Sequence, residues 1–334
     1  MRPALPEGPY LVAGLARSGI AAALALRARG AEVIGVDAGT PDVGRLAAAG
    51  VEVHLDATGI ELVERARTLV KSPGVPQDAP VAVAARARDL DVVGELELAW
   101  RMLPNDFVAV TGTNGKTTTT ELIGHIHRVA GLPVAVAGNV GTAVASLVGE
   151  LDPAATVVCE CSSFQLEDTM AFAPDAAVLL NIEPDHLDRH GTFEAYVEAK
   201  LNGFRRQPAD AVAVAPVDVA VPGAARRVTL GAGGEMDIEA GALVWRGEHL
   251  LSAGELRLPG AHNAQNAAAA AAVALARGID PDAVREGLRT FRGVAHRLEL
   301  VAERDGVAYV NDSKATNVAS VLVALRSYAR GVHL

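Results

Sequence analysis

The sequence predicts an α/β protein in which helices cover parallel sheets. Strand-like apolar runs alternate with helical runs along most of the 334 residues, a pattern typical of βαβ units with right-handed crossovers. Half of the residues are hydrophobic but only 4% are aromatic. Interiors filled by Ala, Val and Leu suit helices on parallel strands better than an all-β sandwich. Two glycine-containing strand-to-helix turns indicate two domains of the nucleotide-binding type.

The first of these domains is expected over residues 1–95 and is Rossmann-like. Its turn, Gly14–Gly19, departs from the GxGxxG fingerprint because Ala16 replaces the middle glycine. Asp37 closes the second strand, where a ribose hydroxyl is bound in such folds. By itself the turn fits either a nucleotide site or a tight packing turn. The expected strands are Tyr10–Ala13, Glu32–Val36, Val51–His54 and Leu69–Val70, with helices over Ser18–Arg29 and Val43–Ala49.

A second series of elements predicts a central ATPase domain with a parallel sheet over residues 96–296. After it, a strand over Val307–Val310 and a helix from about Ala315 indicate the start of a third α/β domain, 297–334, because these two elements cannot bury a core alone. The central elements expected are strands Phe107–Val110, Val134–Val136, Thr156–Cys159 and Ala176–Leu180, short strands within Val219–Leu256, and helices Asn263–Arg277 and Pro281–Thr290.

A phosphate loop is predicted between the strand Phe107–Val110 and the helix that follows it. Backbone N–H groups and the helix N-terminus face the phosphates, Lys116 reaches the β- and γ-phosphates, and the Thr117 hydroxyl binds Mg²⁺. The loop is shorter than GxxxxGK[ST], because Val110 stands at the first glycine. The sequence therefore predicts ATP and Mg²⁺ as cofactors. The loop residues expected to bind ATP are Gly112, Thr113, Asn114, Gly115, Lys116, Thr117 and Thr118.

Four further polar features lie at strand ends or on helices. Glu160 ends a buried strand, where it is either a metal ligand at the ligand-binding edge of the sheet or a surface carboxylate. His186 follows the next strand and either binds metal or caps a loop. Lys200 borders an apolar helical stripe, so a snorkelling Lys with its ammonium group in water is the default interpretation. In His262–Asn266, the Asn side chains either cap the helix or contact a purine.

Charge and cysteine content limit the partners and the compartment. The net charge of −10 argues against nucleic acid and anionic membranes as partners. We expect Cys159 and Cys161 to face opposite sides of a strand, which excludes a mutual disulfide and suits a reducing compartment. The N-terminus lacks the apolar core of a signal peptide, and the longest apolar run, Ala267–Ala276, is too short to span a bilayer. We expect a cytoplasmic monomer.

Taken in order, these segments resemble the Mur ligase family, the ATP-dependent amide ligases of peptidoglycan synthesis. The short loop TGTNGKTT is normal in that family. Within the family, the resemblance is greatest to the branch that adds D-glutamate to UDP-N-acetylmuramoyl-L-alanine. The motifs cover essentially the whole chain: GLARSG, KSPG, GELEL, AGNVG, ECSSFQLE, HLDRH, HNAQN and NDSKATN.

The resemblance also implies roles for particular residues. The UDP substrate would be bound by Arg17, Ser18, Asp37, Ser72, Pro73, Gly74, Asn139, Ser162, Gln165 and His186. One Mg²⁺ would be bound by Thr117 and Glu160, and a second by His186 and a carbamylated Lys200. The catalytic residues would be Lys116, Glu160, His186 and Lys200. Asn266, Arg297 and Asp312 would contact the adenosine, and Lys314 and Thr316 the D-glutamate.

The implied reaction first brings two anions together, a carboxylate and a phosphate, and then joins an amine to the activated carboxyl group. The L-alanine carboxylate attacks the γ-phosphate to give an acyl phosphate, which the D-glutamate amine then attacks, so the site needs cations and fixed donors. The family's third domain would continue beyond Leu334 by roughly a domain's worth of residues. This leaves a ligase-inactive nucleotide-binding module as the alternative, and we expect the chain as given to be inactive alone. A dinucleotide-dependent oxidoreductase is disfavoured because no second glycine fingerprint exists.

Overall fold

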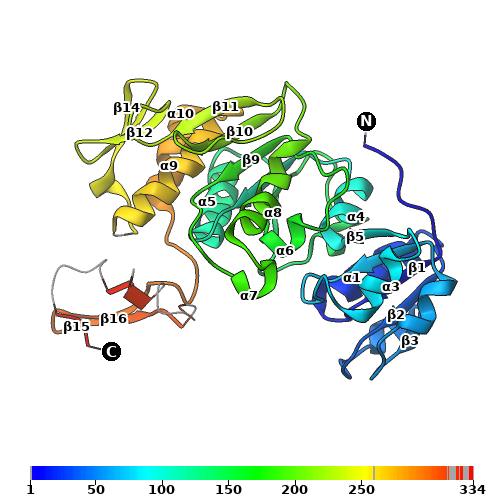
Figure 1. Ribbon diagram of the computed structural model, residues 1–334. Helices are drawn as coiled ribbons and strands as arrows, with labels where there is room; N and C mark the ends of the chain where they lie inside the picture. Colours follow the sequence, from blue (N-terminus) through cyan, green and yellow to red (C-terminus); the bar gives the residue numbers. More distant parts are fainter. Residues whose placement is uncertain are drawn as a thin grey trace.

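The computed structural model confirms the predicted α/β class. It describes all residues except Met1, Pro259, Lys314, 316–320, Val323, 326–330 and Leu334. Two separate sheets, both mostly or wholly parallel, carry helices on their faces (Figure 1). Among the described residues, no helix is long and apolar enough to cross a membrane.

The first sheet is wholly parallel and has the strand order β3-β2-β1-β4-β5. This order reverses between β1 and β4, and the carboxyl ends of strands at such a switch point form the ligand-binding crevice of Rossmann-like sheets. The strand β5 was not predicted. The elements are β1 Tyr10–Ala13, α1 Arg17–Ala28, β2 Val33–Val36, α2 Gly44–Ala48, β3 Glu52–His54, η1 Ile60–Arg65, β4 Thr68–Lys71, α3 Pro80–Arg86 and β5 Asp91–Gly94.

The second sheet has the order β14-β13-β12-β11-β10-β9-β6-β8-β7, and only its β12–β13 and β13–β14 pairs are antiparallel. The phosphate-loop strand β6 lies between β8 and β9. The strand β10 was not predicted. The elements are β6 Phe107–Thr111, α5 Lys116–Val129, β7 Val134–Gly138, η2 Val144–Leu147, β8 Thr156–Glu160, α6 Ser163–Leu166, β9 Ala176–Leu179, α7 Leu187–His190, α8 Phe193–Arg205, β10 Val212–Pro216, β11 Arg226–Leu230, β12 Met236–Glu239, β13 Ala242–Trp245, β14 Glu248–Ser252, η3 Ala253–Glu255, α9 Ala261–Ala276 and α10 Pro281–Thr290.

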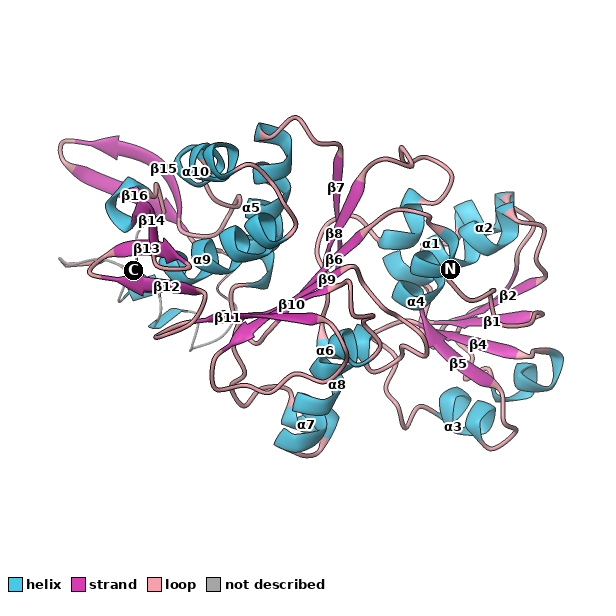
Figure 2. Cartoon of the chain, turned by 90° about the horizontal axis from the view of Figure 1, so that it is seen from above, coloured by secondary structure: helices cyan, strands magenta, loops and turns pink. Residues whose placement is uncertain are grey.

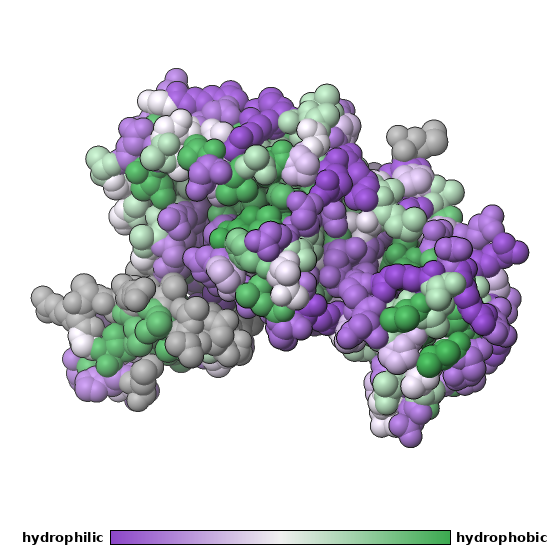
Figure 3. Space-filling view, in the orientation of Figure 1, coloured by the Kyte–Doolittle hydropathy of each residue, from purple (hydrophilic) through white to green (hydrophobic). Residues whose placement is uncertain are grey.

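A two-stranded antiparallel hairpin follows, formed by β15 (Glu299–Arg304) and β16 (Val307–Asn311). The prediction of a strand at Val307–Val310 is confirmed, whereas β15 was not predicted. Apolar side chains of the hairpin lie at the surface (Figure 3): Leu300 and Val301 are 61% and 64% exposed. The helix expected from Ala315 lies mostly outside the described residues. The domain bounds 1–95, 96–296 and 297–334 stay a prediction.

Helix α4 (Glu95–Met102) joins the two sheets. It lies between them in Figure 2, and its apolar residues belong to one core cluster with side chains from both. Glu97 is fully buried, and its carboxylate accepts hydrogen bonds from the backbone N–H groups of Met170, Ala171 and Phe172. The same carboxylate pairs with Arg101 at 2.7 Å. A single side chain thus fixes α4 against the loop before β9.

The expectation that Cys159 and Cys161 face opposite sides of a strand is wrong. Their sulfur atoms lie 3.7 Å apart, and both thiols are buried and free. Residues two apart in an extended segment share a face, because the side-chain period of a strand is two. The pair therefore packs side by side next to Glu160.

We predict that replacing Glu97 with Ala strongly destabilises the protein. The change leaves the N–H groups of Met170, Ala171 and Phe172 without their acceptor, the last of them buried, and the Arg101 guanidinium without its partner. Losing one partner of a buried ion pair costs about 3–5 kcal/mol. The midpoint of urea unfolding should therefore fall. Glu150→Ala removes an exposed carboxylate and is the control. Equal midpoints for the two variants would contradict the role given to Glu97.

Candidate active site

The phosphate loop connects β6 to α5 as predicted, and two of its glycines have positive φ. Gly112 has φ +149° and Gly115 has φ +84°. A Cβ on Gly112 would lie 3.0 Å from the Leu180 Cβ, and one on Gly115 would lie 2.2 Å from the Asn266 side-chain oxygen. The loop therefore depends on glycine both for its backbone conformation and for the close approach of Asn266.

Two lysines converge on one carbonyl oxygen of this loop. The Lys116 Nζ donates to the oxygens of Gly112 (3.0 Å) and Thr113 (2.9 Å), and the Lys200 Nζ donates to the same Gly112 oxygen at 2.7 Å. Lys200 is only 1% exposed, so the snorkelling interpretation is wrong. Burial, followed by the charge of Lys116, lowers the pKa of Lys200 to about 7. Burial also lowers the pKa of Lys116, and the nearby Glu160 opposes that shift.

Two residues that the sequence did not single out hold the loop in place. The Asn181 carbonyl accepts the Thr113 N–H at 3.0 Å, and its side-chain oxygen accepts the Asn114 N–H at 2.8 Å. The Tyr196 hydroxyl lies 2.9 Å from the Thr113 hydroxyl, and its ring centre lies 4.5 Å from the Lys200 Nζ. The position of Asn181 directly after a predicted strand was the available signal, because it places the residue at the ligand-binding edge.

Glu160 lies at the same edge, at the end of β8. It is 3% exposed, so the alternative of a surface carboxylate is wrong. Its Oε1 accepts the Asn139 side-chain amide at 3.0 Å, and its backbone oxygen accepts the Asn139 N–H at 2.9 Å. A Cβ on Gly138, which has φ +121°, would lie 2.2 Å from that backbone oxygen. Glycine therefore lets the AGNVG segment lie against Glu160.

His186 and Thr117 complete the predicted metal ligands. His186 has φ +52° just before α7, and its Nε2 lies 3.6 Å from the Asp185 carboxylate. Thr117 is half-buried in the first turn of α5. Within the described ranges, no group of three or more His, Cys, Asp or Glu side chains could hold a metal ion by itself. A hydroxyl and a carboxylate beside a phosphate loop do suit Mg²⁺, which keeps waters and shares phosphate oxygens.

A cavity of about 260 Å³ lies next to the loop. The N-cap residue of helix α9 is Gly260, which makes no side-chain cap hydrogen bond. Asp312 does not line the cavity; its carboxylate accepts the Leu298 N–H at 3.1 Å. Lys314 and Thr316 are outside the described residues. The cavity is lined by the predicted Asn114, Gly115, Thr118, Asn266 and Arg297, by Asn263, for which a purine contact was one of two predicted alternatives, and by Asn181, Glu183 and His262, which were not predicted as contacts.

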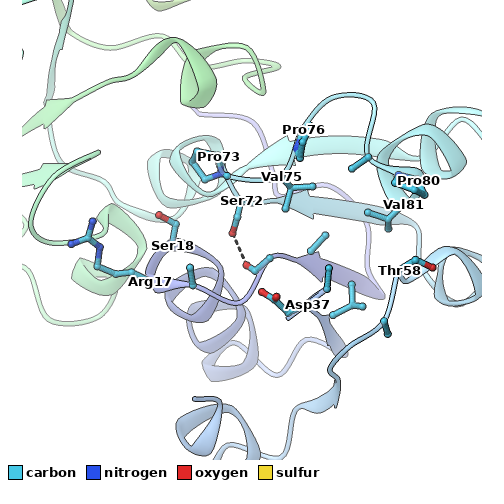
Figure 4. Close-up of a pocket in the computed structure, with 18 of the residues that line it drawn as sticks. Arg17, Ser18, Asp37, Thr58, Ser72, Pro73, Val75, Pro76, Pro80 and Val81 are labelled. Atoms are coloured by element: carbon cyan, nitrogen blue, oxygen red, sulfur yellow. Dashed lines mark hydrogen bonds between the residues drawn. The ribbon is translucent and has the colours of Figure 1, made fainter. Parts of the chain in front are cut away.

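A larger cavity of about 560 Å³ lies at the switch point of the first sheet (Figure 4). The Ser72 hydroxyl donates to the Gly14 oxygen at 2.6 Å, the dashed line in Figure 4. The Asp37 carboxylate accepts the Leu15 N–H at 2.6 Å. The cavity lining includes the predicted Arg17, Ser18, Asp37, Ser72, Pro73, Gly74, Asn139 and Gln165.

Two other predicted substrate residues, Ser162 and His186, are not part of the lining of this cavity. Ser162 instead caps α6, where its hydroxyl accepts the Gln165 N–H at 3.3 Å. Asn139 connects the larger cavity with the phosphate-loop edge, since it lines the cavity and also bonds to Glu160. The two candidate binding regions therefore meet at Asn139.

Comparison with known proteins agrees with this arrangement. The Mur ligase middle domain model matches residues 110–274. UDP-N-acetylmuramoylalanine–D-glutamate ligases from Acidobacterium capsulatum and Pelotomaculum thermopropionicum are 43% and 42% identical to this chain. Each alignment covers 97% of this chain and 75% of the relative.

A solved structure shares the fold at lower identity. The UDP-N-acetylmuramate–alanine ligase from Thermotoga maritima superposes with a TM-score of 0.60 at 23% identity, covering 95% of this chain and 76% of that one. The sequence relatives and this fold agree with each other. The chain therefore belongs to the Mur ligase family, alongside the UDP-N-acetylmuramoylalanine–D-glutamate ligases.

Proposed function

We propose that this chain joins D-glutamate to UDP-N-acetylmuramoyl-L-alanine in an ATP-dependent ligation of peptidoglycan precursor synthesis. The observation that carries this proposal is the convergence of Lys116 and Lys200 on the Gly112 oxygen. Two buried or half-buried cations at the end of β6 provide a site for phosphate groups. Relatives named for this reaction match nearly the whole chain.

The two cavities suit the two nucleotides of the reaction. ATP fits the smaller cavity, because the phosphate loop forms one side of it and Asn266 and Arg297 line the other. The UDP substrate fits the larger one, whose Gly14 turn and Ser72–Gly74 turn lie at the switch point. Asn139 lines the larger cavity and bonds to Glu160 at the phosphate-loop edge, where it would contact the muramoyl peptide.

The chain's own residues reduce the repulsion between the reacting anions. The L-alanine carboxylate attacks the γ-phosphate, and Lys116 is placed to bind the phosphate oxygens during this step. Thr117 and Glu160 would hold Mg²⁺, which when bound withdraws negative charge from the γ-phosphate. The D-glutamate amine then displaces phosphate from the acyl phosphate.

Lys200 is proposed to be carbamylated in the working enzyme. Only the neutral amine combines with CO₂, and a pKa of about 7 leaves a large neutral fraction at neutral pH that grows as pH rises. Carbamylation would replace the second cation with an oxygen ligand. With His186, this carbamate would bind a second Mg²⁺.

The alternative is a ligase-inactive nucleotide-binding module. It requires that the proposed catalytic residues take part in no reaction. The phosphate loop is intact and half-buried, and Glu160 and Lys200 are buried beside it at the same sheet edge. Both cysteines are free thiols, which agrees with the proposed cytoplasmic location.

The first prediction on function concerns phosphate release and Lys116. Because relatives named for this reaction match 97% of the chain, we replace the expectation of inactivity: the protein should release phosphate from ATP only when UDP-N-acetylmuramoyl-L-alanine and D-glutamate are both present. Lys116→Ala should weaken ATP binding by about 1.5–3 kcal/mol, because a charged hydrogen bond is lost. Calorimetry and a phosphate assay measure the two effects. Phosphate release that ignores D-glutamate would favour the nucleotide-binding module instead.

A second prediction uses two glycines that flank the same helix. Gly115→Ala would place a Cβ 2.2 Å from the Asn266 side chain, whereas Gly131→Ala meets nothing within 4 Å. Both have positive φ, +84° and +70°, so the backbone strain is matched. We expect ATP binding by calorimetry to fall at least about tenfold only in Gly115→Ala, a change of about 1.4 kcal/mol. Equal losses would show that strain alone matters.

A third prediction tests the carbamate. Lys200→Ala should lower kcat about 10²-fold or more, the cost of losing one charge-stabilising group. Adding a short carboxylate such as acetate should restore part of the activity by occupying the vacated position. Lys116→Ala, which loses a cation, should gain nothing from acetate. Normal turnover in Lys200→Ala would show that Lys200 is not a metal-binding residue.

A further inference from the structure

The turn Pro73–Val75, which lines the larger cavity, is held from both sides. Within the first sheet, the Lys71 Nζ donates to the Val75 oxygen at 2.8 Å. From the central part of the chain, the Arg189 Nη2 donates to the oxygens of Pro73 (2.9 Å) and Val75 (2.7 Å). The carbonyl groups of the turn are thus engaged by protein cations. The Gly74 N–H has no protein acceptor in the described part of the chain, and a Cβ on Gly74 would meet nothing within 4 Å.

The guanidinium of Arg189 is itself fixed. Its central carbon lies 4.5 Å from the centre of the Phe164 ring, and its Nη2 lies 3.9 Å from the Glu167 carboxylate. The side chain is only 18% exposed. A planar guanidinium can bridge two carbonyl oxygens while it stacks on a ring, which a Lys ammonium group cannot do.

Arg189 belongs to α7, the short helix that begins directly after His186. In Figure 1, α7 lies on the side of the central part that faces the first sheet. The Phe164 ring lies 4.9 Å from the His186 ring and stacks on His190 at 5.3 Å. The His190 Nε2 lies 2.9 Å from the Ser163 hydroxyl. Arg189 therefore joins the cavity turn to the segment that carries a proposed metal ligand.

Other contacts hold the two parts of the chain together without Arg189. Lys71 and Asp168 form an ion pair at 2.7 Å, with side chains 0% and 3% exposed. Gln77 donates to Asp168 at 2.8 Å, and the Gly94 N–H donates to the Asp168 oxygen at 2.8 Å. None of these three contacts includes Arg189, although Lys71 and Arg189 share the Val75 oxygen and both lie 3.9 Å from Glu167. Losing the Arg189 guanidinium should therefore alter the turn, while the contacts of Asp168 still hold the two parts together.

We propose that Arg189 is a positioning residue that fixes the Pro73–Val75 turn relative to α7. It thereby sets where the diphosphate of the UDP substrate lies with respect to the phosphate loop. This inference rests on the proposed function, since it takes the larger cavity as the UDP site. Neither Arg189 nor its contacts were identified from the sequence beyond the HLDRH motif.

The test measures substrate binding and stability in the same variants. Arg189→Lys keeps the positive charge, and Arg189→Gln keeps a donor without the charge. Both should weaken calorimetric binding of UDP-N-acetylmuramoyl-L-alanine roughly 10–100-fold, the range for a lost charged hydrogen bond. Mg-ATP binding and the thermal midpoint should stay as in the wild type. Arg205→Lys is the control, because Arg205 pairs with Glu198 on the exposed face of α8.

Four results would overturn or separate the proposals. Unchanged UDP-substrate binding in Arg189→Lys and Arg189→Gln overturns the positioning role. A lower thermal midpoint together with weaker ATP binding also overturns the positioning role, because Arg189 would then only stabilise the folded protein. A wild-type protein that binds the UDP substrate without D-glutamate-dependent phosphate release contradicts the proposed ligase function, while the binding data still decide the role of Arg189. If the wild type does not bind the UDP substrate, both proposals fail.

Discussion

The carbonyl oxygen of Gly112 accepts hydrogen bonds from two lysine side chains, and the rest of the site is arranged around this contact. Two ammonium groups that share one acceptor repel each other in a poorly hydrated place, where repulsion is stronger than in water. Two changes relieve it: an anion that binds to both, or the loss of one charge. The low pKa of Lys200 makes the second change easy near neutral pH. Phosphate binding and a neutral Lys200 are thus two ways to reduce the repulsion between the Lys116 and Lys200 ammonium groups.

The contact of Lys116 and Lys200 with the Gly112 oxygen lies where parallel strands end, and the sheet topology places Glu160 and Asn181 at the same edge. The strands β6, β8 and β9 are neighbours in register, so Thr111, Glu160 and Leu179 end at one edge. Residues just after these ends, such as Asn181, then reach the loop from a different part of the chain. The first sheet adds its own switch point, and α4 and the Lys71–Asp168 pair connect it to the second.

Local features were predictable from the sequence, whereas contacts between distant segments were not. The strand, loop and helix around Lys116 are encoded within the consecutive residues 107–129, so pattern and glycine placement were sufficient. The burial of Lys200 was not predictable from its own helix, because the Gly112 oxygen that covers it belongs to a loop 88 residues earlier. Arg189 and Tyr196 were missed for the same reason. The placement of Cys159 and Cys161 on opposite faces was an error in applying the strand period, because residues two apart in a strand share a face.

The shared core around α4 has a consequence for how the protein melts. Leu96, Leu98 and Trp100 pack in one cluster with Val12 from the first sheet and Phe107 from the second. Neither sheet can lose its structure without exposing apolar surface that belongs to the other. The two sheets should therefore unfold as one cooperative unit, with a single calorimetric transition. A ligand that binds beside one sheet then also protects the other sheet from heat and from proteolysis, although the ligand does not contact that second sheet.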